Sequence, residues 1–172
     1  GPFRVSPPTR KSYFAPHVLC RECLMRNWRQ DGPFEMTIDS DLEAVLHVQD
    51  TVAQRLQSCH FEEREIFGIR LALEEALVNA IKHGNREDRG KKVRIELFVR
   101  HDRIDIGVAD EGPGFIPENV ADPLAAENLE RPSGRGLLLM RHYMSEVTYH
   151  PPGNRLTMSM LRASGNGNGK GK

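Results

Sequence analysis

The stretch that decides the fold is residues 71–85, LALEEALVNAIKHGN. Apolar residues recur in and before it at spacings of three and four, which predicts an amphipathic helix from about Glu62 to Lys82, with Gly84 in a C-cap position. At about 100° per residue, one side of this helix is an apolar stripe made of Ile66, Ile69, Leu73, Ala76, Leu77 and Ala80. The opposite side carries Glu75, Asn79, Lys82 and His83. We expect this apolar side of the helix to pack against the core.

The polar side of this helix has two interpretations. It is either a solvated face, in which Glu75 and Asn79 merely support the helix, or part of a functional site. Asn79 favours the second, because the short amide of an asparagine competes for backbone hydrogen bonds and disfavours a helix interior. Its amide oxygen is a neutral hard ligand suited to Mg²⁺, and Glu75, one turn earlier, could accept a proton.

The segments around this helix predict the rest of the fold. Residues 34–38 alternate as a strand, and capping side chains at 39–41 precede a first helix that runs to about Cys59. Residues 93–100 and 103–110 alternate as a hairpin, 137–147 read as a helix, and 147–150 with 155–161 read as a closing hairpin. We therefore expect an α+β fold, a two-layer α/β sandwich with helices on one face of a mixed, mostly antiparallel sheet.

The length of 172 residues predicts one folded unit. We place it at residues 33–163. Residues 1–32 form a basic, Pro- and Arg-rich arm that we expect to be irregular, and its Gly1-Pro2 start is typical of a cleaved tag. Residues 164–172 are a Gly/Asn/Lys tail that we expect to be flexible.

Charge and hydropathy narrow the class of protein. Lys+Arg 24 balance Asp+Glu 24, so nothing predicts direct binding to nucleic acid. The chain lacks an apolar run of the roughly 20 residues that span a bilayer, and a cytoplasmic location is the default expectation. The three cysteines, Cys20, Cys23 and Cys59, are an odd number, which argues against a disulfide framework. We expect reduced thiols, with a zinc site at Cys20 and Cys23 as the alternative.

Two glycine clusters carry further chemistry. In ADEGPGF, residues 109–115, Asp110 ends a predicted strand and is followed by Gly112 and Gly114. A carboxylate in such a turn can accept a hydrogen bond from an exocyclic amine such as that of adenine. In SGRGLLLM, residues 133–140, Gly134 and Gly136 precede a helix whose free N–H groups suit phosphate. Neither cluster fits the phosphate loop or the dinucleotide fingerprint.

Together with Glu75 and Asn79, these clusters give the chain a resemblance to the GHKL (Bergerat-fold) ATPase superfamily. Within it, the chain resembles the serine/threonine kinases that act as bacterial anti-sigma factors, over about residues 34–161. The resemblance implies that Asn79 binds Mg²⁺, that Glu75 is the catalytic base, and that Asp110 contacts adenine in a pocket shaped by Gly112 and Gly114.

The resemblance also assigns the phosphate end of the site. Residues implied to lie at or near the phosphates are Lys82, His83, Gly134, Arg135, Gly136 and Leu137. Residues 116–133 resemble the ATP lid. The related kinases carry a catalytic arginine just before the second glycine motif, and Arg131 is the match, although Pro132 intervenes here and departs from the pattern.

The function implied by the resemblance is that of an anti-sigma factor kinase. Such a protein binds ATP and Mg²⁺, sequesters a sigma factor as a homodimer, and phosphorylates a STAS-type antagonist on Ser or Thr. A sensor histidine kinase is a poorer match, because His47 lacks the acidic neighbour and trailing proline expected of a phosphoacceptor. The alternative from another class is an ATP-gated protein-binding module that transfers no phosphate.

Overall fold

A computed structural model describes residues 33–100, 102–114 and 135–162. Its elements in chain order are β1 (Phe34–Asp39), α2 (Glu43–Ser58), α3 (Glu63–Asn79), the π-helical turn η2 (Ala80–Gly84), β2 (Lys92–Val99), β3 (Arg103–Asp110), α4 (Arg135–Tyr143), β4 (Glu146–His150) and β5 (Arg155–Leu161). The predicted arm (1–32) and tail (164–172) lie outside the described residues.

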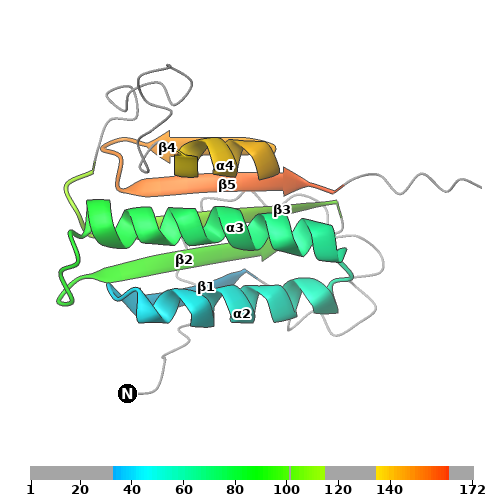
Figure 1. Ribbon diagram of the computed structural model, residues 1–172, viewed down its shortest axis with the longest axis horizontal. Helices are drawn as coiled ribbons and strands as arrows, with labels where there is room; N and C mark the ends of the chain where they lie inside the picture. The colour runs from blue at the N-terminus through cyan, green and yellow to red at the C-terminus, as the bar shows by residue number, and fades with distance from the viewer. Residues whose placement is uncertain (1–32, 101, 115–134, 163–172) are drawn as a thin grey trace, which may run out of the picture.

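The strands form one sheet in the order β1-β2-β3-β5-β4. Helices α2, α3 and α4 all lie on the same side of it, with α3 across the middle (Figure 1). All four pairings are antiparallel, so the parallel pair that a mixed sheet would include is absent from the described strands. The predicted α+β sandwich is confirmed.

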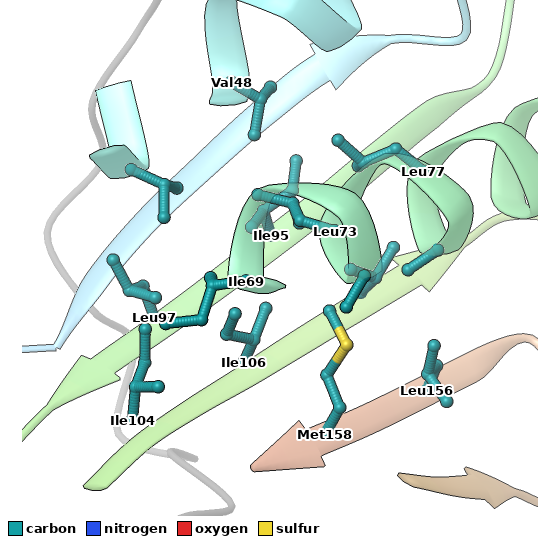
Figure 2. Close-up of a cluster of buried hydrophobic side chains, with 14 of the residues drawn as sticks. Val48, Ile69, Leu73, Leu77, Ile95, Leu97, Ile104, Ile106, Leu156 and Met158 are labelled. Atoms are coloured by element: carbon teal, nitrogen blue, oxygen red, sulfur yellow. The ribbon is translucent and has the colours of Figure 1, made fainter. Parts of the chain in front are cut away.

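The core lies between α3 and the central strands. Every residue of the predicted apolar stripe of α3 is buried. Opposite it, alternate residues of the strands point toward the helices, because successive side chains of a strand face opposite sides of a sheet. Figure 2 shows Leu73 and Leu77 of α3 among Ile95 and Leu97 of β2 and Ile106 of β3. These large side chains are all less than 2% exposed, so α3 is fixed firmly on the sheet.

Helix α2 is attached to α3 by a partly buried polar contact. The Gln49 amide donates hydrogen bonds to the Arg70 carbonyl oxygen at 3.1 Å and to the Glu74 carboxylate at 3.2 Å. Glu74 therefore serves the packing of the two helices. The neighbouring Glu75 points away from this contact by the angle between consecutive helical residues, about 100°.

Two helix ends differ from the predicted ones. Helix α4 begins at Arg135 and ends at Tyr143, so the expectation of helix to Val147 is wrong. The physical reason is pairing with β5: the Ser145 N–H donates to the Ser159 carbonyl oxygen at 2.7 Å, and Glu146 already lies opposite Ser159 in the sheet. Residues 145–147 have a helical sequence pattern, but they pair with β5 and end the helix early.

The end of α3 also differs from the prediction. The α-helix stops at Asn79, and Ala80–Gly84 form a π turn, in which the Asn85 N–H donates to the Ala80 carbonyl oxygen at 2.7 Å. The residues with positive φ after it are Arg86 and Glu87, at 56° and 58°. Gly84 is therefore not a left-handed C-cap, and that interpretation is wrong.

Asn85 connects the π turn to the sheet. It is 0% exposed. Its side-chain amide donates to the Lys92 carbonyl oxygen at 2.9 Å, and its side-chain oxygen accepts the Glu111 N–H at 2.9 Å. One side chain thus holds together the end of the helix, the start of β2 and the glycine loop after β3.

Replacing Asn85 by alanine is expected to lower the free energy of unfolding by about 1–3 kcal/mol, because buried backbone groups lose their hydrogen-bond partners. Urea denaturation measures this loss. Gln54→Ala, an exposed change on α2, is the matched control and should leave stability within about 0.5 kcal/mol of the wild type. Equal stability of the two variants would contradict the connecting role of Asn85.

Candidate functional site

An open pocket lies where the end of α3 meets strands β3, β4 and β5. Its lining residues are Ala76, Asn79, Ala80, Val108, Asp110, Tyr149, Gly153, Asn154, Arg155 and Leu156. Asn79 and Asp110, predicted from separate motifs, therefore share one pocket. The antiparallel order of the sheet causes this, because it brings the end of β3 beside the β4–β5 turn.

Asp110 forms one wall of this pocket. Its carboxylate Oδ1 accepts the Gly112 N–H at 2.8 Å, and its own backbone N–H donates to the Asn154 carbonyl oxygen at 2.9 Å. Burial raises the pKa of Asp110, while the Gly112 N–H and the charge of Lys91 oppose the rise. The side chain is a fixed acceptor, suited to an amine donor on a ligand.

Two glycines allow the backbone to pack directly against Asp110. A Cβ on Gly84 would lie 2.3 Å from the Asp110 carboxyl carbon, and a Cβ on Gly112 would lie 2.0 Å from the Gly84 carbonyl oxygen. No real Cβ tolerates such distances. Gly84 is thus needed for its contact with Asp110, a role that only the tertiary structure reveals.

The glycine loop is also held against the β4–β5 turn. Gly114 has φ +84°, and a Cβ there would lie 2.3 Å from the Pro152 carbonyl oxygen. The left-handed backbone and the close contact both require glycine at this position. The Asn154 amide in turn donates to the Gly112 carbonyl oxygen at 3.4 Å. Residues 111–114 are therefore positioned from both the π turn and the closing hairpin.

Glu75 lies against the first turn of α4. A Cβ on Gly136 would lie 2.1 Å from the Glu75 carboxylate oxygen Oε2, so only glycine allows this approach. Burial raises the pKa of Glu75, and the neighbouring charge of Glu74 raises it further. A carboxylate with a raised pKa is a better proton acceptor once ionised. The first turn of α4 thus lies beside a candidate general base.

Asn79 is half-buried, and it lines the pocket beside Tyr149, whose pKa it lowers as a hydrogen-bond partner. Tyr149, on β4, is a pocket residue that the sequence analysis missed. The closing-hairpin pattern predicted its strand but gave its hydroxyl no role. The available signal was its position opposite Leu156 on a core-facing row, where a polar-tipped aromatic residue needs a partner for its hydroxyl.

The remaining predicted site residues fall into three groups. Lys82 and His83 are exposed on the π turn and do not line the pocket. Leu137 is half-buried in the first turn of α4 and packs against the core, and Arg135 is the first residue of that helix. Arg131, Gly134 and the predicted lid, residues 116–133, lie outside the described residues.

The oxygen ligands of the pocket suit Mg²⁺. In proteins this ion binds through one or two protein oxygens and keeps waters and substrate phosphates as its other ligands. The amide oxygen of Asn79, a pocket residue one helical turn from Glu75, could be such a ligand. Within residues 33–100, 102–114 and 135–162, no three His, Cys, Asp or Glu side chains gather as a metal cage. Cys20 and Cys23, the alternative zinc ligands, lie outside these ranges.

None of the described helices combines the length and the apolar character required to cross a bilayer.

Comparison with known proteins points to one family. Residues 38–160 match the histidine kinase-like ATPase domain. The serine-protein kinase RsbW of Bacillus subtilis is 30% identical over 125 residues, which cover 66% of this chain and 74% of that protein. The anti-sigma F factor of Clostridium perfringens is 35% identical over 101 residues, covering 57% and 71%.

A further relative and a solved structure are also similar to this chain. The serine/threonine-protein kinase BtrW of Bordetella bronchiseptica is 29% identical over 85 residues, covering 48% of this chain and 60% of that protein. The crystal structure of the RsbU and RsbW domains of Rv1364c from Mycobacterium tuberculosis superposes with a TM-score of 0.54 at 17% identity. That match covers 76% of this chain and 31% of the other. At this identity the structural match shows a shared fold.

Proposed function

Because this chain belongs to the histidine kinase-like ATPase domain family, we propose that it is an anti-sigma factor serine/threonine kinase. It binds Mg-ATP, sequesters a sigma factor and phosphorylates a STAS-type antagonist on Ser or Thr. The observation that carries the proposal is the meeting of three predicted residues. Asn79 and Asp110 line one pocket, and Glu75, one helical turn from Asn79, lies against Gly136 in the first turn of α4.

In this proposal Asp110 accepts a hydrogen bond from the exocyclic amine of adenine, and Asn79 offers its amide oxygen to Mg²⁺. When bound, the ion neutralises charge on the transferred phosphate. The first turn of α4, which lies against Glu75 at Gly136, would offer backbone N–H groups to the phosphates. The two ends of the nucleotide would thus bind at different places: adenine at the end of β3 and the phosphates near the start of α4.

Glu75 is the proposed base for the transfer. The substrate Ser or Thr hydroxyl gives its proton to the Glu75 carboxylate while its oxygen forms a bond to the γ-phosphorus. The bond from that phosphorus to the bridging oxygen breaks, and ADP leaves with the electron pair. Burial raises the pKa of Glu75, which suits it to hold that proton. Glu74 does not face the pocket, because its carboxylate points toward α2 and accepts the Gln49 amide.

The named relatives support the proposed kind of partner. A serine-protein kinase and an anti-sigma F factor are both similar to this chain along most of their own length. We further propose that the protein is a cytoplasmic homodimer that binds a sigma factor and a STAS-domain antagonist, with no direct contact to nucleic acid or membrane.

Incubating the purified chain with γ-labelled ATP, Mg²⁺ and candidate STAS proteins tests the activity. Label on a Ser or Thr of one of these proteins is the expected result. Nucleotide binding without transfer to any candidate, combined with ATP-dependent capture of a sigma factor, would replace the kinase by an ATP-gated binding module. The neighbouring genes supply the candidates.

Replacing Asp110 by asparagine tests the adenine end of the site. The NH₂ group of asparagine can face the adenine amine as a second donor, so we expect ATP to bind at least about tenfold more weakly. Titration with a fluorescent ATP analogue measures the affinity. Asp102→Asn, an exposed change in the β2–β3 link, is the matched control and should bind normally. Wild-type affinity in Asp110→Asn would refute the assignment of the adenine pocket.

A further inference from the structure

The hydroxyl of Tyr149 occupies a special place in the pocket. Tyr149 lies on β4 opposite Leu156 of β5, and both line the pocket together with Asn79. The Asn79 side chain lies near the Tyr149 hydroxyl in this pocket and lowers the pKa of that hydroxyl as a hydrogen-bond partner. The charges of Glu75 and Arg141 lie close enough to act on the same hydroxyl. The phenol therefore reaches the polar wall of α3 from the far side of the pocket.

The hydrogen bond restricts how Asn79 can present its oxygen. An amide group is planar, with its oxygen on one side and its NH₂ on the other. A hydrogen-bond partner that holds the NH₂ group therefore also fixes the direction of the amide oxygen. If the oxygen faces a cation, the NH₂ remains for the Tyr149 oxygen. Asn79 has only two side-chain torsions, so a single fixed contact outside the helix is enough to hold its amide plane.

The state of the phenol is compatible with this contact. Burial raises the pKa of the Tyr149 hydroxyl, although the Asn79 hydrogen bond and Arg141 oppose the rise. The group stays a neutral phenol near pH 7, whose oxygen can accept from the Asn79 NH₂. A neutral partner neither repels the metal nor competes with it for the amide oxygen.

We propose that Tyr149 is a positioning residue that holds the Asn79 amide with its oxygen toward the Mg²⁺ of the bound nucleotide. This inference rests on the proposed function, because it assumes that Mg-ATP occupies the pocket. Tyr149 thereby adds a residue of β4 to a nucleotide site whose other predicted residues lie on α3 and in the two glycine clusters.

The test is the Mg²⁺ dependence of nucleotide binding in Tyr149→Phe. This variant keeps the ring and removes only the hydroxyl. A fluorescent ATP analogue is titrated into wild type and variant at increasing Mg²⁺ and also in EDTA. The Mg²⁺ concentration for half-maximal binding should rise about 2–10-fold, as expected for one lost hydrogen bond, with affinity in EDTA unchanged. Tyr143→Phe is the control and should behave as wild type, because Tyr143 packs on Gly68 and Phe67.

A double-mutant cycle separates positioning from general packing. In an Asn79→Ala background, Tyr149→Phe should have no further effect on the Mg²⁺ dependence, because the amide that it positions is gone. An unchanged Mg²⁺ requirement in Tyr149→Phe, or equal weakening with and without Mg²⁺, would overturn the inference while the proposed function stands. Wild-type protein without Mg²⁺-dependent ATP binding would overturn both.

Discussion

Replacing Glu75 by glutamine is expected to slow phosphoryl transfer about 10²–10⁴-fold, the usual contribution of a general base. Glutamine has nearly the same shape, so the close contact with Gly136 should survive. What it lacks is the ability to accept a proton from the substrate hydroxyl. ATP affinity should therefore stay within a few fold of the wild type. Single-turnover transfer of labelled phosphate to the antagonist, measured beside nucleotide titration, separates the two effects.

The adjacent acid provides the control. Glu74→Gln removes a carboxylate of the same type one residue away, but that carboxylate holds the Gln49 amide of α2. The variant should transfer phosphate at close to the wild-type rate. A large loss of transfer in Glu74→Gln, with activity retained in Glu75→Gln, would reverse the assignment. Loss of ATP binding in Glu75→Gln would mean that Glu75 serves the nucleotide rather than the substrate proton.

Replacing Gly84 by alanine should damage both stability and nucleotide binding. The added Cβ would lie 2.3 to 2.5 Å from all three atoms of the Asp110 carboxyl group. Either the π turn or the carboxylate must move. Overpacking of this kind costs about 1–3 kcal/mol of unfolding free energy. A displaced Asp110 also loses its fixed direction in the pocket, so ATP affinity should fall by about tenfold or more. Thermal denaturation and ATP titration measure the two losses.

Two comparisons make this result specific. Gly90→Ala adds a Cβ in an exposed turn, where the nearest atom is an oxygen of the exposed Asp88 side chain, and should be nearly neutral. Gly84→Asn distinguishes the two interpretations of the glycine. A left-handed C-cap would accept asparagine, whereas the contact with Asp110 excludes any side chain. Wild-type stability and ATP affinity in Gly84→Asn would restore the C-cap interpretation.

Local patterns in the sequence predicted most of the fold. The apolar stripe of α3, the alternation of β2 and β3 and the closing hairpin all depend on periodicity, which the core then uses directly. The same helical geometry placed Glu75 on the polar side of α3 with Asn79. Asp110 and Asn79 were recognised because each is an unusual residue at its local position: a carboxylate before a glycine turn and an amide within a helix.

The features that could not be predicted depend on contacts between distant segments. The end of α4 is set by pairing of Glu146 with β5. The requirement for Gly84 comes from Asp110, which belongs to another strand. Tyr149 joins the site only because the sheet order places β4 at the pocket. Each of these features depends on contacts between segments that are distant in the sequence. The local sequence pattern alone does not contain those contacts.

The π turn after Asn79 also fixes the number of residues that this part of the chain can contain. A π turn accommodates one residue more than an α-helical turn over the same rotation. The number of residues from Asn79 to Gly84 is therefore fixed. Only this number keeps Asn79 in the pocket and Gly84 against Asp110 at the same time. A gain or loss of one residue there would carry Gly84 off the Asp110 carboxylate, whereas the exposed turn at residues 86–90 can absorb such a change. Among relatives, variation in length should therefore accumulate in that turn and spare the five residues of η2.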